Sequence, residues 1–276
     1  MNGTSSSGTG AGSARGRDWQ ATSFLMATFF LIVPIALLLI LAARERPTPE
    51  EDYARAVREA MQPTSSAISR SLVSVSLDQL AKVVTWTRHE SISDYQGKTV
   101  APPNKDTWVT VFPHLKTFCQ DYVRSHGTDP KQLSLRLEQR LGLPPGTNYD
   151  TFVELTVDPK NISNFFRPCS DPSPSTNACQ PALRLKPEEL QAGLRATDSK
   201  KKEEMGSRYW FLNNYYNSFA FTKQFPWTSL GYTFDWAPSE AGDHFVRFGE
   251  SEFVVPAGAA ITPGSATDTV SYCTPQ

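Results

Sequence analysis

The longest stretch without a charged residue, residues 21–43 (ATSFLMATFFLIVPIALLLILAA), constrains the fold of this chain more than any other feature. At about 1.5 Å of rise per residue, a helix of this length spans the roughly 30 Å hydrocarbon core of a bilayer. We therefore expect residues 21–43 to form a transmembrane helix in contact with lipid, mildly kinked at Pro34. The apolar region of a cleaved signal peptide is shorter, so an uncleaved signal anchor is favoured over a cleaved signal. Residues 1–20, rich in Gly, Ser and Thr, are predicted to be a disordered tail.

The orientation of this helix depends on two opposing signals. More basic residues follow the apolar segment than precede it: Arg15 and Arg17 lie before it, and Arg44, Arg46, Arg55 and Arg58 after it. That count alone places the large domain in the cytoplasm, but large domains are translocated largely regardless of their charge. The cysteines favour the opposite side. We expect a single-pass protein with a cytoplasmic N-terminus and a periplasmic or extracellular C-terminal domain.

Four cysteines, Cys119, Cys169, Cys179 and Cys273, carry the argument for an oxidising compartment. Cys169 and Cys179 bracket a loop of turn residues that has no core of its own, and a disulfide there stabilises by about 3 kcal/mol. Cys119 and Cys273 then pair by elimination, although four cysteines allow three connectivities. The alternative is four reduced cysteines in a cytoplasmic domain. Neither the cysteines nor the four histidines have zinc-site spacing, so no metal site is predicted.

The order of predicted elements after the anchor indicates a single extracytoplasmic α+β domain. Residues 44–63 form a juxtamembrane helix that starts at Thr48, Pro49 and Glu51, a capping-box pattern with proline at the first helical position. Within residues 64–276, helices are predicted from Pro113 to Gly127, over 131–141 and over 187–195. Strands are predicted over residues 82–88, 108–112, 151–157, 230–236, 244–255 and 267–273. We expect a mainly antiparallel sheet with several short helices, stabilised by disulfides.

Composition and motifs exclude several functions. The chain has 27 Lys and Arg against 28 Asp and Glu, so it lacks the basic excess that nucleic-acid binding requires. No phosphate-binding loop, nucleophile elbow, zinc-protease motif or dinucleotide-binding turn occurs in the sequence, and no cofactor is predicted.

Aromatic residues are concentrated in one region of the soluble part. Twelve of the 31 aromatic residues lie between residues 209 and 236. Such a region suits stacking on a sugar or contact with a partner protein, because Trp and Tyr combine a large apolar body with a polar tip. The predicted binding residues are Trp210, Tyr215, Tyr216, Trp227, Tyr232 and Trp236. The alternative is that Tyr232, Phe234 and Trp236, which share one strand face, belong to the core.

Carboxylates provide the weaker candidates for catalysis. Glu250 and Glu252 lie two residues apart on a predicted strand, and the sequence ESEFVVPAG resembles the last motif of arginine-directed ADP-ribosyltransferases. The resemblance covers fewer than ten residues, and neither an arginine strand nor a Ser-Thr-Ser element precedes it. It implies catalytic glutamates; the alternative is two solvated glutamates on the outer face of an edge strand. Asp235 together with Glu240, Glu250 or Glu252 is a candidate glycosidase acid/base pair.

The predicted function follows from the anchor, the disulfides and the aromatic region. We expect a membrane-anchored extracytoplasmic accessory or binding protein, a non-catalytic subunit or partner of a larger membrane complex. Its partners are the lipid bilayer, a membrane protein and, as a further candidate, a glycan. The alternative is a membrane-anchored enzyme that acts on an extracellular glycan or another polymer.

Overall fold

The computed structural model describes residues 46–181, 210–219, 224–242 and 244–275. The predicted tail, the predicted transmembrane helix and the predicted helix over 187–195 lie outside these residues. Within them, no helix combines the length and apolarity needed to cross a bilayer. The residues Thr48–Gln276 form one compact unit.

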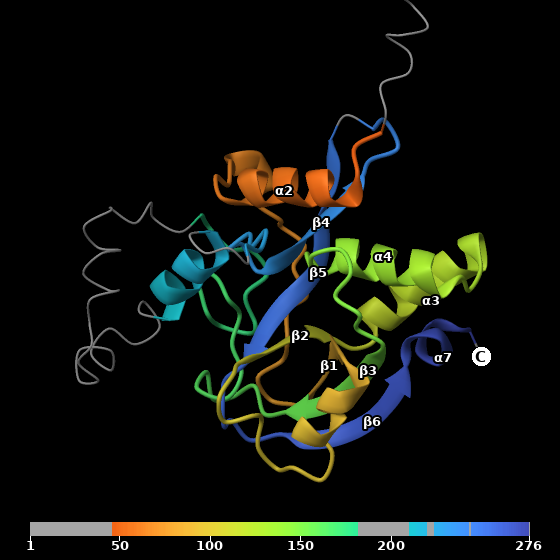
Figure 1. The fold of residues 1–276 in the computed structure, drawn as a ribbon. Helices are drawn as coiled ribbons and strands as arrows, with labels where there is room; N and C mark the ends of the chain where they lie inside the picture. The colour runs from red at the N-terminus through yellow and green to blue at the C-terminus, as the bar shows by residue number, and fades with distance from the viewer. Residues whose placement is uncertain (1–45, 182–209, 220–223, 243, 276) are drawn as a thin grey trace, which may run out of the picture. The chain divides into compact units, whose positions relative to one another are not determined.

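A six-stranded, entirely antiparallel sheet is the centre of this unit (Figure 1). Its strands are β1 (Ala81–Thr87), β2 (Thr107–Val111), β3 (Thr151–Val157), β4 (Tyr232–Pro238), β5 (Phe245–Val255) and β6 (Thr262–Asp268). They are arranged in the order β4-β5-β2-β1-β3-β6, and every neighbouring pair is antiparallel. The prediction of an α+β fold with a mainly antiparallel sheet is therefore confirmed.

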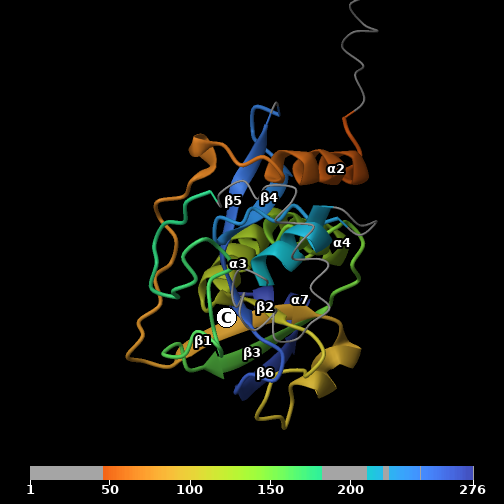
Figure 2. The same ribbon diagram turned by 90° about the vertical axis from the view of Figure 1, so that its left-hand side faces the viewer.

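Helices pack against the sheet (Figures 1 and 2). The α-helices are α2 (Pro49–Ala60), α3 (His114–His126), α4 (Pro130–Arg140), the short α7 (Thr269–Cys273) and a helix over residues 210–219. Two 3₁₀ turns, Ser65–Ala67 and His89–Asp94, interrupt the long connections before and after β1. In both views α2 lies across β4, away from β1, β3 and β6.

Helix α2 begins where its capping residues predict. The Thr48 side chain accepts a hydrogen bond from the Glu51 amide, and the Glu51 carboxylate accepts one from the Thr48 amide. This reciprocal pair satisfies two amides that the first helical turn leaves without partners. The buried face of the helix, Ala56, Val57 and Ala60, packs on aromatic residues of β4 and β5. The helix is thus part of the folded domain.

The strand β1 shows how the central sheet divides two apolar clusters. Val83 belongs to a cluster that long loops cover, and Val84 and Trp86 belong to a cluster beneath α3, α4 and α7. This two-sided burial follows from the alternation of side chains along a strand. The cluster beneath the helices is the one that borders the cavity described below.

Both predicted disulfides are present, and none of the four cysteines is free. The Cys119–Cys273 bond joins α3 to α7, with Cα atoms 5.1 Å apart. The Cys169–Cys179 bond closes the turn-rich loop, with Cα atoms 6.0 Å apart. Each separation lies in the normal range for a disulfide.

The predicted final strand over residues 267–273 is wrong in most of its length. Strand β6 ends at Asp268, and residues Thr269–Cys273 form the helix α7. The cause is local, because the Asp268 carboxylate accepts a hydrogen bond from the Ser271 amide and caps the helix. The same contact lowers the pKa of Asp268 from its usual value.

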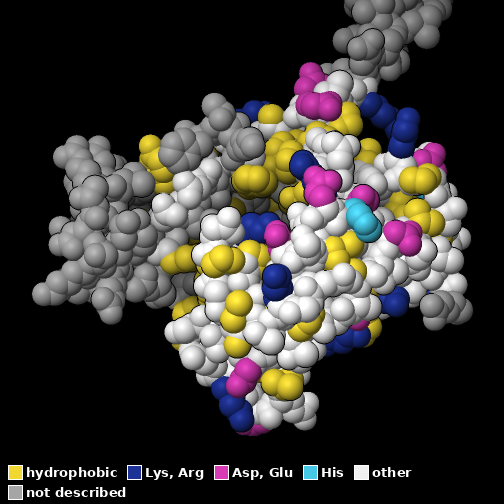
Figure 3. Space-filling view, turned by 60° about the horizontal axis from the view of Figure 1, so that its bottom comes forward, with side chains coloured by type: hydrophobic (Ala, Val, Ile, Leu, Met, Phe, Trp, Pro, Cys, Tyr) yellow, Lys and Arg dark blue, Asp and Glu magenta, His cyan; other side chains and the backbone are white. Residues whose placement is uncertain are grey.

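Charged side chains of both signs are interspersed on the face shown in Figure 3. No large region of one sign is visible there, in keeping with a formal net charge of −1. Electrostatic attraction to a polyanion therefore has no support on this face.

Candidate ligand-binding cavity

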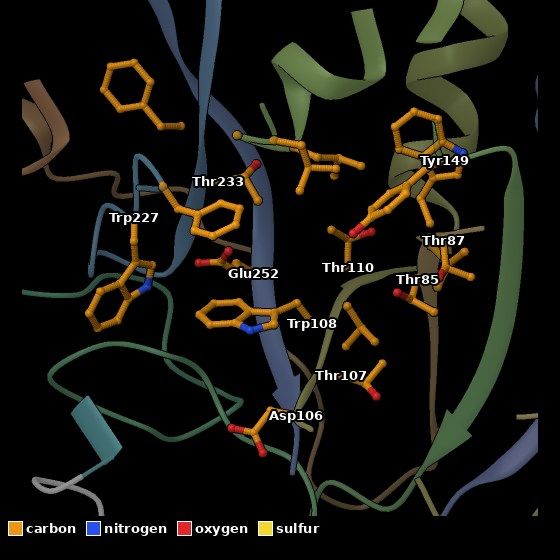
Figure 4. A pocket seen from close by; sticks show the side chains of 18 of the residues that line it. Thr85, Thr87, Asp106, Thr107, Trp108, Thr110, Tyr149, Trp227, Thr233 and Glu252 are labelled. Atoms are coloured by element: carbon orange, nitrogen blue, oxygen red, sulfur yellow. The ribbon is translucent and has the colours of Figure 1, made fainter. Parts of the chain in front are cut away.

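A cavity of about 380 Å³ lies against the sheet, on the side that α3 and α4 cover (Figure 4). Strands β1, β2 and β5 form its floor, and the residues 141–143 after α4 form one wall. The helix over 210–219 and the segment 225–227 contribute the opposite wall. Its lining extends from buried residues such as Thr110 to the exposed side chains of Lys105 and Phe225. This volume falls in the range of small-molecule sites.

The strand register brings the key polar groups of the floor together. Thr110 of β2 and Glu252 of β5 are directly paired across the two strands, so their side chains lie on the same face. Trp108, two residues before Thr110, shares that face, and in Figure 4 the Glu252 side chain lies beside it in the cavity. The cavity floor therefore combines a carboxyl group, a hydroxyl group and an indole ring.

Several residues that line the cavity have a buried polar atom without a hydrogen-bond partner. Among the described residues, eight buried side-chain nitrogen and oxygen atoms lack a hydrogen bond, and four of them belong to residues that line the cavity. These four are Thr110 Oγ1, Asn214 Nδ2, Trp227 Nε1 and Glu252 Oε2. A buried polar group without a partner costs about 1–3 kcal/mol. Their concentration around one cavity makes this cavity the candidate ligand site.

Glu252 is the acidic group with the most unusual environment. Burial raises the pKa of its carboxyl group to about 8, and the nearby Arg167 guanidinium only partly opposes this shift. Arg167 is fully buried and donates to the carbonyl oxygens of Gly231 and Val73, at 3.0 and 2.5 Å. Burial also lowers the pKa of Arg167 to about 10. At neutral pH the Glu252 carboxyl is therefore largely protonated and can both donate and accept a hydrogen bond.

The other two catalytic candidates, Asp235 and Glu250, lie outside the cavity lining. Asp235 is completely buried and accepts two hydrogen bonds from Arg136 of α4, at 3.1 and 2.8 Å. Glu250 accepts one from Arg140 Nε at 2.8 Å. These contacts hold α4 on β4 and β5, so both carboxylates have a structural role.

The expectation of two solvated glutamates on an edge strand is wrong. Glu250 is 5% exposed and Glu252 Oε2 is enclosed, because β5 lies between β4 and β2 and helices cover this face. The two glutamates share a face, as their spacing predicts. They differ in environment, since Glu250 meets an arginine and Glu252 meets the cavity.

The predicted binding residues are distributed over several environments. Trp227 and Tyr232 line the cavity. Trp210 lies beside the rim, where its indole N–H donates to Asp106 Oδ2 at 2.7 Å, and its ring is 5.9 Å from that of Trp108. Tyr215 packs on Phe219, and the side chain of Tyr216 is half-buried on the same helix.

Tyr232 and Trp236 have core contacts. The Tyr232 hydroxyl donates to the Ala67 carbonyl at 2.7 Å, and burial raises the pKa of Tyr232 to about 12. Trp236 is fully buried and its indole N–H donates to the Leu143 carbonyl at 2.9 Å. Phe234 is also buried, so the alternation of these three aromatics reflects the core.

The sequence prediction missed Trp108, Thr110 and Asn214 as site residues. Trp108 and Thr110 alternate in the short strand TWVTV, and an indole beside a hydroxyl on one strand face was the available signal. Asn214 lies on the helix over 210–219, which the sequence did not predict because its apolar residues have no regular helical period. Within the described residues, no group of three or more His, Cys, Asp or Glu side chains is placed to hold a metal ion.

Comparison with known proteins gives no relative. No protein-family model, no curated protein and no solved structure matches this chain.

Proposed function

We propose that this protein is a membrane-anchored extracytoplasmic binding protein that recognises a small ligand in the cavity between β2, β5 and the helix over 210–219. Residues 21–43 support the anchor because of their length and apolarity. The two disulfides support an oxidising compartment, in which such bonds persist. In this proposal the N-terminus is cytoplasmic, and the domain serves a larger membrane complex as a non-catalytic subunit.

The observation that carries the binding function is the set of unpartnered polar atoms around an aromatic-walled cavity. Ligand sites are typically concave and mostly apolar, with a few convergent polar groups and a residue of perturbed pKa. Trp108, Trp227 and Phe234 supply the apolar walls, and Glu252 is the perturbed residue.

The competing function is hydrolysis of a glycan, and Glu252 is the observation in its favour, because a protonated carboxyl is a suitable general acid. Such hydrolases use a second carboxylate across the sugar. The other carboxylate among the described lining residues is Asp106, which already accepts hydrogen bonds from Trp210 and the Ala257 amide. Because these hydrogen bonds already occupy the Asp106 carboxylate, ligand binding is favoured over glycan hydrolysis.

A pair of matched tryptophan variants tests the binding site. Trp227→Phe and Trp236→Phe each remove one indole N–H, but the first is unpartnered in the cavity and the second is bonded to Leu143. Full-length protein in detergent is screened against a small-molecule library by thermal shift. We expect at least one ligand whose stabilisation is reduced in Trp227→Phe and kept in Trp236→Phe. A library with no ligand sensitive to Trp227 contradicts the proposal.

The membrane and partner parts of the proposal need separate measurements. Thiol labelling of the native protein, with and without reductant, is expected to detect thiols only after reduction. Four free thiols in the native protein would contradict an extracytoplasmic domain. Purification from membranes is expected to yield the protein together with a larger complex, and isolation as a lone monomer contradicts the accessory role.

A further inference from the structure

The hydrogen-bonding groups of the cavity restrict the ligand. Asn214 Nδ2 and Trp227 Nε1 can only donate, so the ligand must carry acceptors. An alkylammonium or guanidinium ion has donors alone and leaves both groups unpaired. A purely apolar ligand leaves all four unpartnered atoms of the cavity unpaired, at the cost of their burial.

Charge restricts the ligand further. Lys105 is the one cationic side chain among the described residues of the lining, and its ammonium group bonds to Asp94 at 2.9 Å. The buried Arg167 lies outside the lining and gives two of its N–H groups to backbone carbonyls. An anionic ligand therefore meets no uncommitted cation here, and it meets the carboxyl group of Glu252. Because that carboxyl is largely protonated at neutral pH, it offers a cationic ligand little charge as well, and the second carboxylate of the described lining, Asp106, already accepts hydrogen bonds from Trp210 and the Ala257 amide.

The side chains of the cavity walls restrict the shape of the ligand. Trp108, Trp227, Phe234 and Tyr149 present aromatic surface, and Thr110 contributes an unpartnered hydroxyl group beside them. A ligand that fits has acceptors and donors at its edge and apolar faces for stacking. A saturated ring with several hydroxyl groups has this combination, because its hydroxyls both donate and accept while its C–H face is apolar.

We infer that the cavity binds a neutral sugar, with Trp227, Asn214, Thr110 and Glu252 bonding to its hydroxyl groups and Trp108 contacting its apolar face. This inference rests on the proposed binding function and specifies the ligand of the same site. It does not require cleavage of the sugar.

A titration with neutral sugars and their charged counterparts tests this ligand class. Full-length protein is held in a detergent without a sugar headgroup and studied by isothermal titration calorimetry. The probes are the methyl glycosides of glucose, galactose, mannose and N-acetylglucosamine, with the matching 2-amino sugars and uronic acids. At least one neutral sugar is expected to bind, and its charged counterparts are expected to bind about tenfold more weakly, since each adds an unpaired charge.

Glu252→Gln separates a neutral from a cationic ligand, and Trp227→Phe tests the contribution of the indole N–H. Glu252→Gln keeps a donor and an acceptor, so affinity for the neutral sugar is expected to change by less than about threefold, whereas Trp227→Phe weakens it by about tenfold. Trp236→Phe, whose indole lies outside the lining, is expected to bind the sugar as the parent protein does. Thermal unfolding of each variant verifies that it is folded.

Several results overturn the inference: no neutral sugar binds, an amino sugar or uronic acid binds more tightly, or Glu252→Gln loses more than about tenfold in affinity. The failure of the sugar assignment is distinguishable from the failure of the proposed function. If a library compound of another class binds and depends on Trp227, the binding function stands and the sugar inference is wrong. If neither the sugars nor the library bind, both are wrong.

Discussion

Glu252→Gln is expected to make the domain more stable at neutral and alkaline pH. The ordinary pKa of this carboxyl is 4.5, and burial raises it to about 8 in the folded domain. The unfolded chain therefore releases the proton at a lower pH than the folded domain does. The stability contributed by neutral Glu252 is fully present below about pH 4.5 and is lost as the pH rises through about 8.

The size of this effect follows from the two pKa values. Each pH unit between them is equivalent to about 1.4 kcal/mol, so the loss is about 3 kcal/mol at neutral pH and about 5 kcal/mol when the group is fully ionised. Glutamine has nearly the same shape and does not titrate. For a domain of this length, 1 kcal/mol shifts the melting temperature by roughly 2–4 °C. Glu252→Gln is thus expected to melt about 10 °C above the parent protein near neutral pH.

Thermal unfolding of full-length protein in detergent, followed by tryptophan fluorescence across this pH range, measures the effect. The difference between the two proteins is expected to vanish near pH 4.5 and to widen up to about pH 8. The matched control is Glu250→Gln on the same strand face, which removes a charged partner of Arg140 and is expected to destabilise the domain at neutral pH. Parallel pH profiles of the parent and Glu252→Gln would refute the argument, because Glu252 would then not titrate between the two values.

Three further perturbations test the framework around the cavity by urea unfolding. Asp235→Asn removes the buried charge that faces Arg136 and is expected to cost roughly 3–5 kcal/mol, because it leaves a partly buried arginine uncompensated; a loss below 1 kcal/mol would contradict the structural role of this pair. Gly249→Ala places a Cβ against Thr233 Oγ1 of β4 and the Arg140 carbonyl oxygen of α4 and is expected to cost about 1–3 kcal/mol, whereas an unchanged midpoint would show that β4 and α4 do not lie so close to Gly249. Replacing Cys119 and Cys273 by serine opens a loop of 154 residues and is expected to cost about 5 kcal/mol, and a much smaller loss would mean that the unfolded state is already compact.

Much of the fold was predictable because its signals are local. The strand over residues 151–157 alternates clearly in sequence and has these bounds in the structure. The helices α3 and α4 end close to the glycine, proline and cap residues that predict their limits. The C-terminal helix was mistaken for a strand because Val270 and Tyr272 suit a strand, and the Asp268 cap outweighed that preference.

The cavity was less predictable because it depends on contacts between distant parts of the sequence. Thr110 and Glu252 become neighbours only through the register of β2 on β5, and no local pattern fixes that register. The three carboxylates of the candidate sites look alike in sequence. Their environments differ because α4 brings two arginines to Asp235 and Glu250 and none to Glu252. Trp227 was predicted from the aromatic concentration alone, and its unpartnered indole N–H is a property of the folded cavity.

The two disulfides are nested, since the Cys169–Cys179 bond lies within the loop that Cys119 and Cys273 close. A chain oxidised as it is made presents Cys119 and Cys169 together before Cys273 has been synthesised. Joining cysteines in their order of appearance would therefore produce a wrong bond first, between α3 and the turn-rich loop. Efficient maturation then requires that Cys119 remain a thiol until α7 has docked, or that a disulfide isomerase exchange the early bond. The yield of native protein is expected to depend more on thiol–disulfide exchange than on the supply of oxidant.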